Sequence, residues 1–568
     1  MSAAYQDIVQ TPSAFDRATE TFAALKMHMR TAEALQMTHG ELESHVIEKT
    51  RTIARDMLQG HLDLRTGAER PVRVVGAEGV ERGSKRVSPR QLRTLVGHVV
   101  LGRLLYQAVG VNGLAPQDAA LSLTRDSYSM GVRQRVAEEV AGGSFDAAVE
   151  SIGKTSGATI AKRQVERLAR ASVADFEEFY GCLEWKPEDA GQLLVLTMDG
   201  AGIIMRTESL RPQTRALAEQ EAEEPKVWPD RRKSGEKPNR RRVAEVASVY
   251  SVKPFVRSSD DVIGELASIR PIREARQTPT RPRPVNKRVW ASVDKSMSDV
   301  VEQTFQEALR RDPERRRQWV VLVDGQNQQL AAVQAAAQRH GVTVTILCDF
   351  IHTLEYLWKA AHCFHAPGSR EARQWVCERA RSLLEGADAS QVAAGMRRSA
   401  TLRELTNRKA VDKAARYLIK RRHYMRYGDA LGSGLPIATG VIEGACRHLV
   451  RERLDCCGAR WSVIGAEAIL KLRALRLSGD FDEYWRFHLA REHKRNHCSN
   501  YANDIIPEPI PKPRLRLVKK VTCFWRIWPV EKGAALNLVP SKSSRIPPPH
   551  LHWPVLRCLL QARFQLSA

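Results

Sequence analysis

The segment that decides the fold is residues 319–350, which read WVVLVDGQNQQLAAVQAAAQRHGVTVTILCDF. It begins and ends with short apolar runs rich in β-branched residues, and each run has the length of a buried strand. The stretch between them, LAAVQAAAQRHG, is typical of a helix, with Gly341 placed to cap its end. A strand, a helix and a strand at this spacing predict a βαβ unit with parallel strands. We therefore expect an α/β fold.

Aspartates end the apolar runs of this part of the chain. The run LLVLTMDG leads to Asp199, WVVLVDG to Asp324 and VTVTILCDF to Asp349, so each carboxylate is predicted to lie at a strand end. Ligands and reacting groups gather at the strand ends of α/β sheets. Taken singly, each Asp-Gly pair also matches a turn, and Glu443 in a first helical turn also suits the helix dipole. Taken together, these carboxylates indicate a site for hard cations.

The charge of the chain favours a polyanionic partner. The 568 residues include 89 Lys and Arg against 65 Asp and Glu, which gives a formal net charge of +24. Such a surplus attracts nucleic acids, because neutralised phosphates release counterions and give affinity that does not depend on sequence. The alternative is a cytosolic enzyme that is merely basic.

Nothing in the sequence predicts export or a membrane span. Residues 1–20 lack the basic and apolar regions of a signal peptide. The most apolar long stretch, residues 95–111, is interrupted by Arg103 and does not suit a bilayer. The ten cysteines include no CxxC pair, so neither a zinc ribbon nor a disulfide framework is indicated. We expect a soluble protein of a reducing cytoplasm.

The pattern along the chain predicts successive segments of different character. They are a mixed, mostly helical N-terminal region (1–125), a helix-turn-helix-like segment (126–188), the first part of an α/β core (189–352), a helical insertion (353–435), C-terminal core helices that carry Glu443 (436–500) and a basic, proline-rich tail (501–568). Within the first segment, residues 15–60 have helical spacing and residues 95–105 look like a strand. The tail has no sustained periodicity, so we expect a disordered extension, of the kind that read-through or a frameshift produces.

Residues 144–171, SFDAAVESIGKTSGATIAKRQVERLARA, have the pattern of a helix, a short turn and a second helix. The second helix is expected to present Lys162, Arg163, Arg167 and Arg170 to solvent. This pattern is typical of a DNA-binding helix-turn-helix, whose second helix enters the major groove. An ordinary helical hairpin with a solvated basic face explains it equally well.

Three blocks of the sequence carry a family resemblance. They are DGAGI at 199–203, VDGQNQQLAAVQAAAQRHGVTVTILCDFIHTLEYLW at 323–358 and ATGVIEGACRHLVRERLDCCGARWSVIGAEAILKLRALRLSGDFDEYW at 438–485. In order, spacing and flanking residues they resemble the ISKra family of bacterial insertion-sequence transposases, over about residues 15–500. These are DDE enzymes of the RNase H-like superfamily, so the resemblance implies an RNase H-like catalytic core, preceded by a mostly helical DNA-binding region.

The resemblance also implies roles for particular carboxylates. It makes Asp199, Asp324 and Glu443 the catalytic triad, which holds two Mg²⁺ or Mn²⁺ ions. The helical segment between Asp324 and Glu443 looks like the all-α insertion of related DDE transposases. Asp349 and His352 match an aspartate-x-x-histidine element of similar enzymes, which implies a supporting position. An alternative assignment makes Asp349 the second metal ligand, but the longer apolar run before Asp324 favours Asp324.

Basic and aromatic residues follow the predicted catalytic glutamate. Helical spacing places Glu443, Arg447 and Arg451 on one face of a predicted helix. The residues that we expect to bind phosphates near the site are Arg447, Arg451, Arg453 and Arg460. A structural i,i+4 ion pair between Glu443 and Arg447 explains that spacing equally well. For Trp461 we expect core packing beside the site, with stacking on a displaced base as the alternative.

These observations predict a DDE transposase of a bacterial insertion sequence. It is expected to bind the terminal inverted repeats and the target DNA, to cleave the DNA at the element end and to join the freed 3′-OH to the target. We expect it to act as a homo-oligomer on DNA, associated with the nucleoid in the cytoplasm. Two alternatives remain: a metal-dependent nuclease with an RNase H fold, and a DNA-binding protein of transposase origin without catalytic activity.

Overall fold

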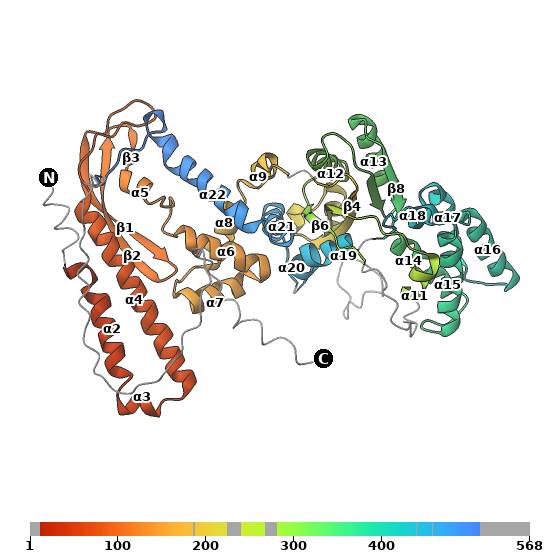
Figure 1. Cartoon of the computed structure of the whole chain (residues 1–568), viewed down its shortest axis with the longest axis horizontal. Helices are drawn as coiled ribbons and strands as arrows, with labels where there is room; N and C mark the ends of the chain where they lie inside the picture. The colour runs from red at the N-terminus through yellow and green to blue at the C-terminus, as the bar shows by residue number, and fades with distance from the viewer. Residues whose placement is uncertain are drawn as a thin grey trace, which may run out of the picture. The chain divides into compact units, whose positions relative to one another are not determined.

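A computed structural model describes residues 12–185, 188–223, 240–266, 281–438, 440–456 and 458–511 (Figure 1). All of them belong to one compact unit, Met1–Lys512. The predictions made for residues 512–568 and for most of the two charged insertions of the core lie outside the described residues. The unit contains both helices and a mixed five-stranded sheet, so the α/β class is confirmed.

The N-terminal region combines two long helices with a small antiparallel sheet. Its elements are α2 (Asp16–His28), α3 (Ala32–Gln36), α4 (His39–Ala68), β1 (Ser84–Thr94), β2 (Gly97–Ala108), β3 (Val111–Leu114) and α5 (Pro116–Ala120). Helix α4 begins at a capping box formed by Thr38 and Glu41, and it packs against both α2 and β2. The strand predicted near residues 95–105 is confirmed as β2, and the helical stretch predicted over residues 15–60 is divided among α2, α3 and α4.

Residues 501–511 are ordered against this region, which contradicts the prediction of a disordered tail from residue 501. The side chain of Tyr501 is buried in an apolar cluster with Val74, Tyr106 and Ala119. The backbone N–H of Ala502 donates to the carbonyl of Val75 at 3.1 Å. The prediction was wrong for these residues because the surface that covers them comes from the other end of the sequence, where local periodicity gives no information.

A cluster of helices follows the N-terminal sheet. It consists of α6 (Met130–Gly142), α7 (Phe145–Ser156), α8 (Lys162–Ala171) and α9 (Phe176–Cys182). Helix α7 ends at Gly157, whose φ of +67° is the left-handed conformation that terminates a helix. Helices α6, α7 and α8 contact one another, and Val165 and Leu168 are buried on the inner face of α8. The predicted helix, turn and helix are therefore confirmed, while DNA binding by them stays a prediction.

The central sheet has the strand order β6-β5-β4-β7-β8. Its strands are β4 (Leu193–Ile204), β5 (Arg241–Val252), β6 (Val285–Ser292), β7 (Trp319–Val323) and β8 (Val344–Cys348). Strands β4, β7 and β8 are parallel, and β5 is antiparallel to both of its neighbours. Helix α13 (Asn327–His340) joins β7 to β8 and ends at Gly341, with a φ of +58°. The predicted βαβ unit is confirmed.

Different helices cover the two faces of this sheet, because alternate residues of a strand point to opposite sides. Leu194 and Val321 belong to a large core that includes residues of α12 (Met297–Arg311) and α13. Val195 and Val320 belong to a second core shared with the helices that follow β8. These are α14 (Phe350–Ala361), α15 (Arg370–Leu384), α16 (Ala389–Leu402), α17 (Lys409–Arg421) and α18 (Tyr427–Gly432), so the helical character predicted for residues 353–430 is confirmed.

The last helices return to the sheet. They are α19 (Gly440–Ala445), the π-helix η4 (Cys446–Arg451), α20 (Glu452–Leu454), α21 (Val463–Ser478) and α22 (Phe481–Asn496). Two helices come earlier in the sequence: α10 (Pro212–Glu223) follows β4, and α11 (Ser259–Leu266) follows β5. Helix α21 packs on β6, and both α19 and η4 contact β4. The chain segment that carries Glu443 therefore lies over the strand that carries Asp199. None of the described helices is long and apolar enough to cross a membrane.

Candidate active site at the carboxyl ends of the parallel strands

The strand register brings the three predicted aspartates to one level. The last pairs of the two parallel ladders are Thr197 with Leu322 and Val323 with Cys348. Asp199 and Asp324 each lie two residues beyond the first of these pairs, and Asp324 and Asp349 each lie one residue beyond the second. Continued along the chain, this register places Asp199, Asp324 and Asp349 side by side across β4, β7 and β8. The structure thus forms one row of carboxylates at the carboxyl edge of the parallel strands.

Asp199 does not end its strand, which corrects the prediction. Strand β4 continues to Ile204, because its whole length pairs with β5, whereas β7 ends earlier at Val323. Asp199 therefore lies in the middle of a strand, at the point where β4 extends beyond β7. Its Oδ1 accepts a hydrogen bond from the backbone N–H of Gly200 at 2.7 Å, and its Oδ2 accepts one from the Sγ of Cys446 at 3.4 Å.

Asp324 follows β7 directly, as predicted, and glutamines orient it. Its Oδ1 accepts from the backbone N–H of Gln326 and its Oδ2 from the Gln326 side chain, each at 2.8 Å. Its own N–H donates to Oε1 of Gln329, whose Nε2 donates to the carbonyl of Met198 at 3.0 Å. Gln329 therefore ties the residue before Asp199 to Asp324. The insertion contributes as well, since the hydroxyl of Tyr417 donates to the Asp324 carbonyl at 3.0 Å.

Asp349 has a structural task at the third strand end. It is 4% exposed, and its Oδ1 caps α14 by accepting from the backbone N–H of Ile351 at 2.7 Å. Its backbone N–H donates to the carbonyl of Val323 at 2.7 Å, which joins the ends of β7 and β8. His352, in the first turn of α14, is partly buried, and its Nδ1 has no hydrogen-bond partner among the described residues. In this row, Asp349 is therefore buried and caps a helix, whereas Asp199 and Asp324 are less buried.

Glu443 and Asp199 act on the same cysteine. Glu443 is exposed on α19, and Cys446, at the start of η4, is buried. Burial raises the pKa of the Cys446 thiol well above its usual range, and the negative charges of Asp199 and Glu443 raise it further. The thiol therefore stays protonated and donates to Asp199. Arg451 acts on the same thiol in the opposite direction, so all four side chains share one electrostatic environment.

The donor set suits a hard divalent cation in its chemistry. Asp199, Asp324 and Glu443 offer carboxylate oxygens, the ligands that Mg²⁺ and Mn²⁺ prefer. In the described parts of the chain, however, no group of three or more His, Cys, Asp or Glu side chains is close enough to hold a metal ion. The structure brings these residues near one another, but not close enough to coordinate one cation together. Since Glu443 is exposed, packing does not fix its side chain.

One further carboxylate belongs to this neighbourhood and was not found from the sequence. Glu245 on β5 pairs with Gly200, next to Asp199. Its buried Oε2 has no hydrogen-bond partner among the described residues. Burial raises the pKa of Glu245 to about 7, and the charges of Asp199 and Asp324 add to this rise while Arg211 opposes it. The signal available in the sequence was a single glutamate within the apolar alternation RVAEVASVYSV.

Glu245→Gln is expected to remove a pH-dependent loss of stability. Because the pKa of Glu245 is raised in the folded state, its contribution to the free energy of unfolding is fully present below the pKa that Glu245 has in the unfolded chain. That contribution is lost as the pH rises through about 7. Urea unfolding at pH 5 and pH 8 should show that wild type loses about 1–2 kcal/mol more than the variant, after allowance for partial exposure of the group. Parallel pH profiles for the two proteins would contradict this assignment.

The segment that carries the arginines after Glu443 is not a regular α-helix. Residues 446–451 form a π-helix, with backbone hydrogen bonds from i to i+5. Arg447 pairs with Glu452 at 3.2 Å, so the alternative i,i+4 ion pair between the described residues Glu443 and Arg447 is not formed. Arg447, Arg451 and Arg460 are nevertheless exposed, and contact with phosphates stays a prediction for them.

Two residues that follow the π-helix, Arg453 and Trp461, are buried in the core. Trp461 is 5% exposed, and its indole N–H donates to the carbonyl of Leu454 at 3.1 Å. Its backbone N–H also bonds the carbonyl of Ile204 at the end of β4, so the predicted core packing is confirmed. Arg453 is buried, with its guanidinium 4.8 Å from the Trp461 ring centre and 5.2 Å from that of Phe145. The prediction that Arg453 faces a phosphate is wrong, because the aromatic rings take it into the core.

The basic residues of the helix-turn-helix-like segment are exposed, as predicted. Lys162 pairs with Asp146 at 2.6 Å and Arg167 with Asp126 at 2.7 Å, whereas Arg163 and Arg170 form no ion pair within the described residues. A cavity of about 600 Å³ lies between this segment and the C-terminal helices, and Lys162, Arg170 and Arg460 line it. The structure thus brings together basic residues that the sequence placed far apart.

No family model matches the chain, and no curated protein matches it. The row of aspartates, the helix that carries Glu443 and the exposed arginines are therefore the observations on which a function rests.

Proposed function

We propose that the chain is a metal-dependent enzyme of phosphodiester chemistry. The observation that carries the proposal is the register that puts Asp199 and Asp324 side by side on parallel strands, with Cys446 linking Asp199 to the helix of Glu443. Several carboxylates near one another suit cation-assisted phosphoryl transfer. The net charge of +24 supports a nucleic acid as the substrate.

More specifically, we propose a DDE transposase with an RNase H-like core, as the resemblance to the ISKra family implies. The mixed sheet supports this, since a run of antiparallel strands, β4 to β6, leads into the parallel strands β7 and β8, and helices cover both faces. The helices between β8 and α19 support the insertion that the resemblance implies. They lie between the aspartates and Glu443 in sequence, whereas α19, which carries Glu443, packs on the strand of Asp199.

The roles of the residues follow from their positions. Asp199 and Asp324 would hold the cations, and Glu443 would complete the set from α19. When bound, Mg²⁺ or Mn²⁺ would activate the attacking water or 3′-OH and neutralise charge on the phosphate. Hydrogen bonds with Gln326 and Gln329 hold Asp324 in its position in the row. We assign Asp324 rather than Asp349 as the second ligand, because Asp349 is buried and already caps α14.

The partners proposed are the terminal inverted repeats of an insertion sequence and its target DNA. The exposed cations on α8 and η4, with Arg460, are candidates for phosphate contacts. Action on paired ends calls for more than one copy of the chain, so we propose a homo-oligomer on DNA, associated with the bacterial nucleoid.

The test uses the full chain and a labelled duplex carrying the DNA that flanks its gene. With Mg²⁺ the proposal expects cleavage at the inverted repeat, and joining of the new 3′-OH to a second duplex. Both products should disappear in EDTA. Cleavage without joining, even with pre-cleaved ends, would favour a nuclease of the same fold. Binding without either product would favour a DNA-binding protein that lacks activity.

A further inference from the structure

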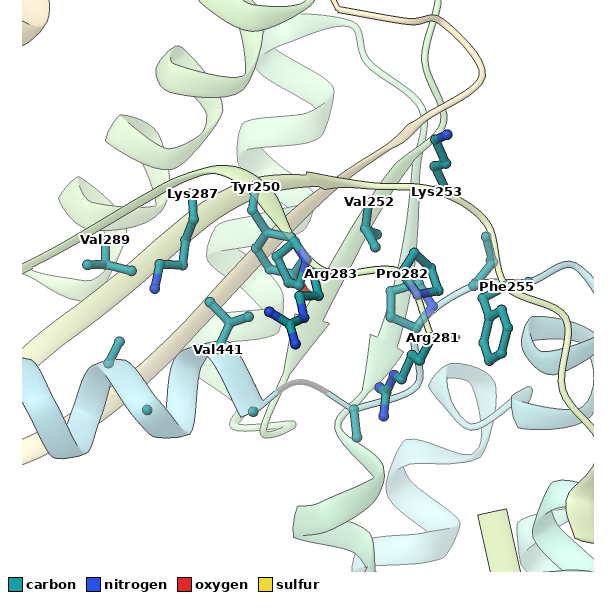
Figure 2. A pocket seen from close by; sticks show the side chains of 18 of the residues that line it. Tyr250, Val252, Lys253, Phe255, Arg281, Pro282, Arg283, Lys287, Val289 and Val441 are labelled. Atoms are coloured by element: carbon teal, nitrogen blue, oxygen red, sulfur yellow. The ribbon is translucent and has the colours of Figure 1, made fainter. Parts of the chain in front are cut away.

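A groove beside α19 has no role in the site described so far. Its volume is about 660 Å³, and it lies between strands β5 and β6 on one side and α19 with residues 434–438 on the other (Figure 2). Tyr250 and Val252 contribute from β5, and Lys287 and Val289 from β6. Residues 281–284, which lead into β6, form part of its wall.

The charged side chains that line the groove all have the same sign. They are Lys253, Arg257, Arg281, Arg283 and Lys287, with His448 as a further titratable group. Lys253, Arg281, Arg283 and Lys287 are exposed, and none of these four forms an ion pair within the described part of the chain. Figure 2 shows Arg283 and Lys287 reaching toward the helix that bears Val441. Uncompensated cations around a cavity raise the local concentration of anions, so the groove suits a chain of phosphates.

The rest of the lining is apolar and includes aromatic rings. Phe255 is partly buried, and Val252, Val441 and Pro282 lie around the same cavity. An aromatic ring next to cations is the combination that binds unpaired nucleotides, because a base stacks on the ring while its phosphate meets the charge. A volume of about 660 Å³ encloses a ligand of a few rings but not a duplex. The lining therefore suits a single strand.

The groove adjoins the helix of the candidate active site. Val441 and Gly444, on either side of Glu443 in sequence, line it, and Ala445 lies next to Cys446. On β5, Tyr250 faces the same side of the sheet as Val246, which pairs with Asp199. The separation of these two residues along the strand is about 13 Å. A strand held in the groove would therefore lie beside the segment that carries Glu443.

We propose that this groove binds an unpaired DNA strand, the single-stranded continuation of the DNA end that is processed at the aspartates. The inference rests on the proposed function for its substrate, but the binding itself needs no catalysis. Arg283 and Lys287 would contact the phosphates, and Phe255 would stack on a base. Recognition of the substrate would then require the duplex end to open.

The experiment compares a groove variant, Arg283→Ala with Lys287→Ala, with a control, Lys85→Ala with Arg86→Ala. The control residues are exposed on β1, away from the groove, and carry the same charge. Fluorescence anisotropy in EDTA measures binding of a labelled oligo-dT strand, a blunt duplex and a duplex with a single-stranded tail. The groove variant should bind the strand and the tailed duplex about tenfold more weakly, and its salt slope on the single strand should fall by about 1.4. Its affinity for the blunt duplex should stay within about twofold of wild type, as should every affinity of the control.

A third variant, Phe255→Leu, separates stacking from charge. It should weaken single-strand binding about fivefold without changing the salt slope. Equal losses on the blunt duplex and the single strand, equal losses in the control, or unchanged binding in the groove variant would overturn the proposal. Because the assay contains no metal and records no cleavage, failure of the proposed transposase activity would leave these results unaffected and readable.

Discussion

Asp324→Asn is expected to lower the rate of Mg²⁺-dependent DNA cleavage by at least about a thousandfold, while DNA affinity changes by less than about twofold. Asparagine keeps the size of the side chain and can still accept the hydrogen bond from the N–H of Gln326. What it removes is the negative charge that a divalent cation needs at this strand end. Single-turnover cleavage of a labelled end duplex, with anisotropy for binding, measures both quantities.

The matched control is Asp349→Asn, in the next strand of the same row. Asp349 caps α14, and asparagine caps a helix about as well as aspartate, so this variant should fold and cleave at close to the wild-type rate. A loss of cleavage in Asp349→Asn together with normal cleavage in Asp324→Asn would reverse the assignment. Loss in both variants would make the whole row necessary and would leave the choice of ligand to metal-binding measurements.

Glu307→Ala is expected to lower the free energy of unfolding by about 3–5 kcal/mol. Glu307 lies on α12 with its side chain fully buried, and it binds the guanidinium groups of three arginines, Arg288, Arg310 and Arg311. Burial by itself would raise the pKa of Glu307, but these cations lower it below its usual range, so the group stays charged. Its removal would leave the buried Arg288 and Arg311 without their counter-charge.

Glu302→Ala provides the control on the same helix. Glu302 also pairs with an arginine, Arg339, and with His340 at 2.8 Å, but its side chain is partly exposed. Its loss should cost less than about 1 kcal/mol, since solvent screens exposed pairs. Urea denaturation followed by tryptophan fluorescence compares the two variants. Similar effects from both would show that burial of the Glu307 cluster adds nothing to its importance.

Local patterns predicted the centre of the fold well. The apolar runs before Asp324 and Asp349 became β7 and β8, and Gly341 ends the helix between them in the expected left-handed conformation. These features depend on neighbours within one turn or one strand, which periodicity and turn residues report directly. The helix-turn-helix-like pair was recognisable for the same reason.

Predictions that depended on distant partners were less successful. Asp199 lies within β4 and not at its end, because pairing with β5 extends the strand beyond β7. Arg447 pairs with Glu452, in a segment that forms a π-helix. Tyr501 is ordered because the N-terminal sheet covers it. In each case the deciding contact comes from backbone pairing or packing that the local sequence does not encode.

By itself, the sequence determined the α/β class, the βαβ unit and the aspartates that follow β7 and β8, because strand and helix periodicities are local properties of the chain. Only the tertiary structure decided that Asp199 lies level with Asp324, that Cys446 joins Asp199 to the helix of Glu443, and that Glu245 has its pKa raised to about 7. The physical reason is that register, burial and electrostatic coupling arise between residues far apart in sequence. They exist only once the strands have paired and the C-terminal helices have packed on the sheet.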